Sequence, residues 1–179
     1  GSKESSEAPL IAIHGGPGMS HSYLYPLTDL ADTRQVIFYD QLDAGLSERP
    51  NNPENWHISR FLLEVDDLRE SLNLDRVAIF GNSWGGTIAA SYAAKKPAGL
   101  ERLILSSPLL NTDLWLADNK AHRENLPPEV LSVMRQCEKE GQESSQEYQD
   151  SVEVFYARHF CRSNPWPDYV IETMNALNE

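Results

Sequence analysis

One serine in this chain lies in a sequence pattern that suits nucleophilic chemistry. Residues 81–86 read GNSWGG, which is the pattern Gly-x-Ser-x-Gly with Ser83 at its centre. In this pattern the serine occupies a sharp turn between a strand and a helix, and its hydroxyl is presented for attack on a carbonyl carbon. Gly81 and Gly85 fit the need for space around a strained serine backbone. Ser83 is therefore the candidate nucleophile.

A glycine-rich turn earlier in the chain could supply a second part of such a site. The turn consists of His14, Gly15, Gly16, Pro17 and Gly18. Attack by a serine places negative charge on the carbonyl oxygen, and backbone N–H groups can stabilise that charge. We expect the N–H groups of Gly16 and Trp84 to be the two donors, because Trp84 begins a helix directly after the nucleophile. His14 is expected to be a structural member of the turn.

Short apolar runs precede both motifs and predict the elements that position them. Strands are predicted at residues 10–13, 35–39, 77–80 and 102–106, and helices at 22–31, 59–72 and 84–96. Strands that alternate with helices indicate a parallel sheet covered on both faces.

The helix predicted at 59–72 has the clearest pattern. Ser59 is the expected cap, and Leu62 and Val65 fall on the buried face. Its charged residues, Glu64 among them, are expected on the faces in water.

The pattern changes after Pro108, where strand signals give way to helical stretches broken by prolines and Gly141. We therefore divide the chain into an α/β core at residues 1–110 and part of a helical cap at 111–179.

Three motifs together resemble the proline iminopeptidase branch of the α/β-hydrolases. They are HGGPG at 14–18, DQLDAGLS at 40–47 and GNSWGG at 81–86, and residues 147–167 resemble the helical cap of those enzymes. The tricorn-interacting aminopeptidase is a similar relative with broader specificity. Asp43 stands where the family usually has glycine. The resemblance implies an α/β-hydrolase fold, with a doubly wound, mostly parallel sheet that is incomplete here and a helical cap.

The histidine and the acid of a serine hydrolase are expected to follow the nucleophile along the chain. After Ser83 the sequence has only His122 and His159, and both fall in the helical segment, so we expect them to be cap or surface residues. The simpler interpretation is that the catalytic acid and base lie beyond residue 179. The apolar strand at 102–106 also suits a central place in a sheet. The missing C-terminal part of the same protein is therefore the expected partner.

The resemblance implies a serine aminopeptidase, which releases an N-terminal residue from small peptides or amides through an acyl-enzyme. Proline is one candidate for that residue, and the 179-residue chain alone is expected to be nearly inactive. An esterase or lactonase on the same fold is one alternative. Another is a non-catalytic truncated hydrolase that serves as an interaction module.

Composition limits the partners. The formal net charge is −12, from 15 basic and 27 acidic residues, and no cluster of Lys or Arg forms a patch. This charge argues against nucleic acid and anionic membranes as partners. No metal-binding motif and no cofactor motif is present, so neither group is expected. With only Cys137 and Cys161, a disulfide framework is not expected, and a cytoplasmic location is favoured.

Overall fold

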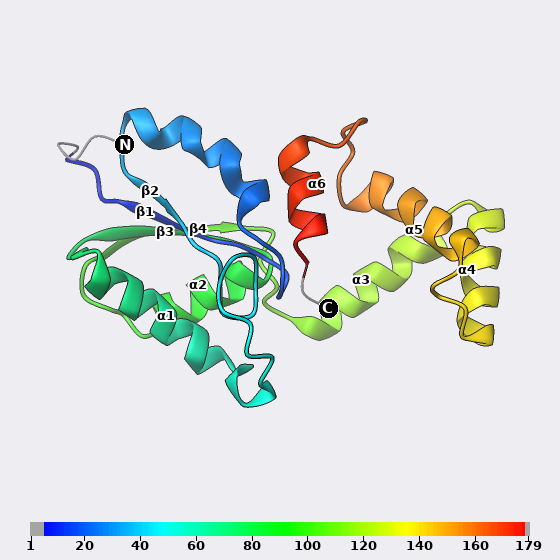
Figure 1. The fold of residues 1–179 in the computed structure, drawn as a ribbon, viewed down its shortest axis with the longest axis horizontal. Coiled ribbons are helices and arrows are strands. Elements are labelled where there is room, and N and C mark those ends of the chain that lie inside the picture. The colour runs from blue at the N-terminus through cyan, green and yellow to red at the C-terminus, as the bar shows by residue number, and fades with distance from the viewer. Residues whose placement is uncertain (1–5, 178–179) are drawn as a thin grey trace. The chain divides into compact units, whose positions relative to one another are not determined.

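The computed structural model describes residues 6–177 and shows a four-stranded sheet in the first part of the chain (Figure 1). The strands are β1 (Leu10–Ile13), β2 (Val36–Phe38), β3 (Val77–Asn82) and β4 (Leu100–Ser106). Their order across the sheet is β2-β1-β3-β4, and each neighbouring pair is parallel. The strands lie where the apolar runs predict them, with ends that differ by no more than about two residues.

Helices cover both faces of this sheet. α1 (Ile58–Ser71) and α2 (Trp84–Ala94) lie on one face, and η1 (Ser22–Asp32) lies on the other (Figure 1). This arrangement follows from right-handed crossovers in a sheet whose strand order reverses after β2. η1 is a 3₁₀ helix, and Pro26 inside it lacks the N–H that an α-helix interior would use. The doubly wound parallel sheet predicted from the sequence is confirmed.

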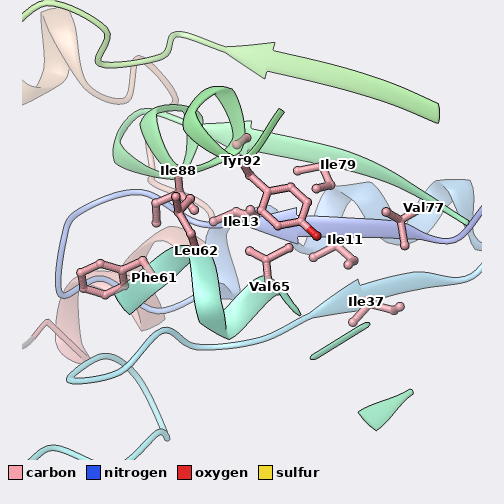
Figure 2. Close-up of a cluster of buried hydrophobic side chains, with 11 residues drawn as sticks. Ile11, Ile13, Ile37, Phe61, Leu62, Val65, Val77, Ile79, Ile88 and Tyr92 are labelled. Carbon is pink, nitrogen blue, oxygen red and sulfur yellow. The ribbon is translucent and has the colours of Figure 1, made fainter. Parts of the chain in front are cut away.

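The apolar core lies between the sheet and the helices α1 and α2 (Figure 2). Ile11, Ile13 and Ile79 come from the two central strands, and they pack with Val65 of α1 and Ile88 of α2. None of these five side chains has exposed surface. Because burial of one such side chain is worth roughly 1.5 to 3 kcal/mol, the core fixes the two strands whose ends carry the glycine-rich turn and Ser83.

The N-terminus of α1 differs from the prediction. The cap is His57, whose Nδ1 accepts a hydrogen bond from the N–H of Arg60 at 3.3 Å. Ser59 lies inside the helix, and its hydroxyl donates to the same ring nitrogen at 2.6 Å. The prediction of Ser59 as cap was wrong because a neutral imidazole nitrogen is also an acceptor and lies at the correct position.

The polar face of α1 is less exposed than its sequence indicates. Glu64 is half-buried, its pKa is raised by burial, and its Oε2 accepts from the N–H of Leu42 at 3.5 Å. Arg69 donates to the Tyr92 hydroxyl at 2.9 Å and also to carbonyl oxygens in the loops before β3 and β4. The Tyr92 hydroxyl in turn donates to Asp66 at 2.6 Å. These polar side chains therefore tie α1 to α2 and to the adjoining loops.

Residues 111–167 form a second compact unit, which consists of helices. They are α3 (Thr112–Glu124), α4 (Pro128–Glu140) and α5 (Gln146–His159). The final helix, α6 (Asp168–Asn175), belongs with the first unit, where it packs against η1. Its Thr173 is completely buried and accepts a hydrogen bond from the N–H of Tyr23 at 2.9 Å. The sequence division at residue 110 placed this helix with the cap, and the contacts place it with the sheet.

β4 forms one edge of the sheet within residues 6–177. Leu103, Ile104 and Leu105 follow one another along this strand, and each is 36% to 40% exposed. A run of apolar side chains pointing to both faces is typical of a strand inside a parallel sheet rather than at its edge. The edge of the sheet at β4 is therefore an apolar surface.

Two adjacent leucines on α1 allow a matched test of this core. Leu62 is 4% exposed and Leu63 is 52% exposed. We expect Leu62→Ala to lower the free energy of unfolding by about 2 to 5 kcal/mol, because it leaves a cavity beneath the sheet. Leu63→Ala should cost less than about 1 kcal/mol. Urea denaturation followed by circular dichroism measures both values, and equal losses would contradict this placement of α1.

Candidate active site

Ser83 lies at the junction of β3 and α2, with φ of 52° and ψ of −118°. A positive φ is costly for a residue other than glycine, so surrounding contacts must hold it. The Ser83 N–H donates to the carbonyl of Ser106 at 3.1 Å, and the Ser83 carbonyl accepts from Gly86 at 2.9 Å and from Leu109 at 3.0 Å. Within the described residues the Ser83 hydroxyl makes no hydrogen bond. The turn therefore holds the backbone and leaves the hydroxyl free to react.

The glycines around Ser83 are required by close packing. A Cβ on Gly85 would lie 2.2 Å from the carbonyl oxygen of Ile13, and a Cβ on Gly81 would lie 2.4 Å from that of Gly85. Both distances are far below normal contact, so no larger residue fits without moving a backbone segment. The sequence predicts this requirement for space. The close packing brings the end of β1 directly against the sharp turn at residues 81–86, the elbow that carries Ser83.

The glycine-rich turn after β1 packs against the nucleophile. A Cβ on Gly15 would lie 3.0 Å from the Cβ of Ser83. Gly16 has φ of 118°, and a Cβ there would lie 2.8 Å from the backbone nitrogens of Gly18 and Met19. Pro17 and Gly18 continue the turn, as the motif predicts.

The two expected donors have no competing partner. Among residues 6–177, neither the N–H of Gly16 nor the N–H of Trp84 donates a hydrogen bond. Trp84 is the first residue of α2, where N–H groups point out of the helix and favour negative charge. Unused N–H groups next to a serine can stabilise an oxyanion.

Tyr23 of η1 connects the turn to the elbow, and sequence reasoning missed it. Its hydroxyl accepts a hydrogen bond from the Gly15 N–H at 2.6 Å and donates one to Asn82 Oδ1 at 2.7 Å. Burial raises the pKa of Tyr23 to about 12, so the hydroxyl keeps its proton at neutral pH. Asn82 was visible inside the GNSWGG motif, but nothing local in the sequence connects it with Tyr23. The contact depends on the packing of η1.

His14 is completely buried and joins the turn to the loop after β2. Its Nδ1 donates to the carbonyl of Gly15 at 2.8 Å, and its Nε2 accepts from the N–H of Gln41 at 3.0 Å. The Gln41 amide donates to the His14 carbonyl at 2.8 Å and accepts from the indole N–H of Trp84 at 3.0 Å. This arrangement requires neutral imidazole, and burial lowers the pKa of His14 accordingly. These contacts join the glycine-rich turn to the loop after β2, and the structural part expected of His14 stays a prediction.

The loop at residues 40–47 is organised by Asp40. Its carboxylate accepts hydrogen bonds from the N–H and the ring of His21, at 2.9 Å and 2.8 Å, and from the N–H of Leu46 at 2.8 Å. Burial opposes ionisation of Asp40, but these hydrogen bonds outweigh it and lower its pKa to about 2. The hydroxyl of Ser47 donates to the Asp40 carbonyl at 2.6 Å. The loop is thus fixed to the beginning of η1.

A cavity of about 270 Å³ opens beside this arrangement. Its lining includes Pro17, Gly18 and Trp84, which carry or adjoin the two unused N–H groups, and the aromatic rings of Trp56 and Phe61. Leu42, Asp43 and Asn51 from the loop after β2 complete the lining. The aromatic rings make the cavity suitable for an apolar group attached to a reacting carbonyl.

The two histidines that follow Ser83 in the sequence lie in the helical unit. His122 of α3 and His159 of α5 stack with ring centroids 4.4 Å apart. Within residues 6–177 neither ring is hydrogen-bonded to a carboxylate, as the histidine of a catalytic triad would be. Their expected place outside the catalytic machinery stays a prediction.

Two other features are absent from the described residues. In this part of the chain no group of three or more His, Cys, Asp or Glu side chains could hold a metal ion. No helix in it has the length and apolar character needed to cross a bilayer.

Comparisons with known proteins agree with this fold. A family model described as alpha/beta hydrolase fold matches residues 8–174. The chain is 44% identical over 152 residues to a proline iminopeptidase of Heyndrickxia coagulans, which covers 85% of this chain and 52% of that protein. It is 36% identical over 178 residues to a proline iminopeptidase of Thermoplasma volcanium, covering 98% of this chain and 60% of that protein. The chain thus spans little more than half the length of these curated relatives.

Solved structures give the same result. The crystal structure of VinJ matches with a TM-score of 0.93 and 33% identity, covering 98% of this chain and 61% of that chain. The proline iminopeptidase of Mycobacterium smegmatis matches with a TM-score of 0.88 and 32% identity, covering 97% and 60% of the two chains.

The buried neutral state of His14 predicts a pH dependence of stability. Its pKa is lowered in the folded protein, whereas the unfolded chain should have the ordinary value near 6.5. Below that pH the unfolded chain binds a proton that the folded protein does not, so stability present above pH 6.5 is lost as pH falls toward the folded-state pKa.

Urea denaturation of the wild type and of His14→Gln between pH 7.5 and pH 5 tests this expectation, since glutamine keeps a donor and an acceptor but does not titrate. We expect the wild type to lose more stability than the variant over this interval. Parallel pH profiles of the two proteins would show that His14 is not held neutral by folding.

Proposed function

The chain belongs to the alpha/beta hydrolase fold family and resembles its proline iminopeptidases, and from that premise we propose that Ser83 is the nucleophile of a serine aminopeptidase. The observation that carries the proposal is the free hydroxyl of Ser83 beside two unused donors, the N–H groups of Gly16 and Trp84. The choice of reaction is supported by the similarity to proteins named proline iminopeptidase.

In this proposal the Ser83 oxygen attacks the carbonyl carbon of the substrate's first residue, and the serine proton passes to a general base. The carbonyl oxygen becomes negative and is held by the N–H groups of Gly16 and Trp84, each worth roughly 3 to 4 kcal/mol in comparable enzymes. The C–N bond then breaks, the amine takes a proton and leaves, and an ester to Ser83 remains. Water hydrolyses this ester and releases the N-terminal residue.

The substrate class in this proposal is a small peptide or amide with a free N-terminal residue, proline being the first candidate. The apolar cavity beside Trp84 suits the side chain of that residue. We place the general base and its acid in the part of the whole protein that follows residue 179, because the chain spans little more than half of its relatives. The apolar edge at β4 would pair with a strand from the same part. Two free cysteines fit a cytoplasmic location.

The proposed reaction predicts the behaviour of Ser83→Ala in the full-length protein. We expect the wild type to cleave proline 4-nitroanilide and the variant to lose roughly 10⁴-fold or more in kcat. A fluorophosphonate should label the wild type and not the variant, as detected by mass spectrometry. The 179-residue chain alone should show little turnover, since the base is absent from it in this proposal.

Substrate choice separates the alternatives. Cleavage of simple 4-nitrophenyl esters, with no cleavage of any aminoacyl 4-nitroanilide, would replace the aminopeptidase by an esterase. If the full-length protein neither reacts with fluorophosphonate nor cleaves esters or nitroanilides, a non-catalytic binding module would be the remaining interpretation.

Tyr23 is a positioning residue in this proposal, because it holds the peptide of Gly15 next to the Gly16 donor. Tyr23→Phe should lower kcat by roughly 10- to 100-fold while KM changes little, since a small displacement of oxyanion donors weakens only the transition state. Tyr25→Phe removes a hydroxyl from the same helix and is the matched control, with no loss expected. Equal kcat values for the two variants would show that Tyr23 does not position the oxyanion donors.

A further inference from the structure

The cavity beside Ser83 has two walls that are held in different ways. On one wall, the indole of Trp84 is hydrogen-bonded to Gln41 and packs edge-to-face on Phe61, with ring centroids 5.6 Å apart. On the other wall lies Trp56, which follows the short 3₁₀ helix η2 (Pro53–Asn55) and is 56% exposed. Its indole N–H donates to Asp43 Oδ2 at 2.9 Å. The indole of Trp84 is therefore held by a hydrogen bond and by ring packing, and the indole of Trp56 is held by its hydrogen bond to Asp43.

We propose that Asp43 and Trp56 act together as a specificity determinant, in which the Asp43 carboxylate fixes the indole of Trp56 and restricts the cavity to one small apolar acyl side chain. This inference rests on the proposed function, because it assigns the side chain of the substrate's first residue to the cavity. Asp43 is a positioning residue here, and Trp56 is the wall that touches the substrate.

The backbone of Asp43 supports a role for its side chain. Asp43 has φ of 62°, a conformation that glycine adopts at lower cost. The side chain is buried, with 6% of the residue exposed, and Oδ1 accepts from the N–H of Asn51 at 2.8 Å. Its own N–H donates to the carbonyl of Glu48 at 2.9 Å. The two hydrogen bonds from Asn51 and Trp56 offset the strain and hold both of these lining residues in place.

The position of the cavity determines what it can bind. Its lining includes Pro17, Gly18 and Trp84, which carry or adjoin the two N–H donors along the chain. A carbonyl oxygen held by those donors would direct the adjoining acyl group into the cavity. A volume of about 270 Å³ lies below the range of roughly 300 to 1,000 Å³ that is usual for drug-sized ligands. One small side chain or ring therefore fits better than a long chain.

The test compares substrates of different size on the full-length protein. The 4-nitroanilides of proline, alanine and phenylalanine are assayed with the wild type, Asp43→Gly, Asp43→Asn and Trp56→Phe. We expect Asp43→Gly and Trp56→Phe to lower the ratio of kcat/KM for proline over phenylalanine by roughly 10-fold, since pocket shape contributes discrimination of this size. Asp43→Asn keeps an acceptor oxygen and should lose less. Asp67→Asn, on the exposed face of α1, is the matched control and should leave the ratio unchanged.

A double substitution tests whether the two residues act as a unit. Asp43→Gly combined with Trp56→Phe should change the ratio no more than either change alone. Additive effects, or an unchanged ratio in both single variants, would overturn the inference. Thermal unfolding of each variant shows whether the protein is still folded, and Asp43→Asn keeps the test valid where Asp43→Gly does not fold.

A binding experiment tests this inference separately from the proposed function. In full-length Ser83→Ala, prolinamide and cyclopentanecarboxamide are titrated by calorimetry, with and without Asp43→Asn or Trp56→Phe. Weaker binding of both amides supports the inference, even if the wild type cleaves no nitroanilide and the proposed function fails. Loss of prolinamide alone in Asp43→Asn would show that the carboxylate binds the substrate's amine, and would overturn it.

Discussion

The close approach of two backbone segments organises this molecule. The end of β1 and the first turn of α2 meet where Gly85 faces the carbonyl oxygens of Ile13 and His14, at distances that exclude any side chain. This contact places the glycine-rich turn after β1 directly beside Ser83. The buried isoleucines of β1 and β3 supply the free energy that keeps the two segments together. The reactive geometry is therefore a consequence of core packing rather than of flexible loops.

Hydrogen bonds then decide which backbone groups remain available. The Tyr23 hydroxyl accepts a hydrogen bond from the N–H of Gly15. Gln41 donates its backbone N–H to the ring of His14 and accepts a hydrogen bond from the indole of Trp84. These groups are buried or partly buried and would be costly to leave without a partner. The N–H groups of Gly16 and Trp84 donate no hydrogen bond among the described residues. Three strand ends contribute to this edge of the sheet, as is usual where the strand order of a parallel sheet reverses.

The features that could be predicted from the sequence are those encoded by neighbouring residues. Continuous apolar runs locate all four strands, and GNSWGG and HGGPG locate the turn and the elbow, because glycine at a close approach is a local requirement. Tyr23, Thr173 and the indole of Trp56 were not foreseen, since their partners are distant along the chain. The prediction of the cap of α1 was wrong for a different reason. His57 and Ser59 both carry hydrogen-bond acceptors, and only the path of the backbone determines which of them caps the helix. Glu64 was predicted to be exposed to solvent because its face of the helix consists of polar residues. In the structure the loop at Leu42 contacts its carboxylate.

In the proposed site, different parts of the structure determine reactivity and substrate selectivity, and Asp43 belongs to the part that determines selectivity. The elements that would stabilise an oxyanion are backbone N–H groups, whose positions depend on glycines and on the sheet and not on the chemistry of any one side chain. The cavity wall depends on side chains, and Asp43 contributes to it from a loop position whose positive φ would suit glycine. A residue with a strained backbone whose side chain accepts two hydrogen bonds is a local conflict with a compensating gain, which is the pattern expected at functional sites. Under the proposed function, a change in this loop would alter which acyl group is accepted while the turn and the elbow stay as they are.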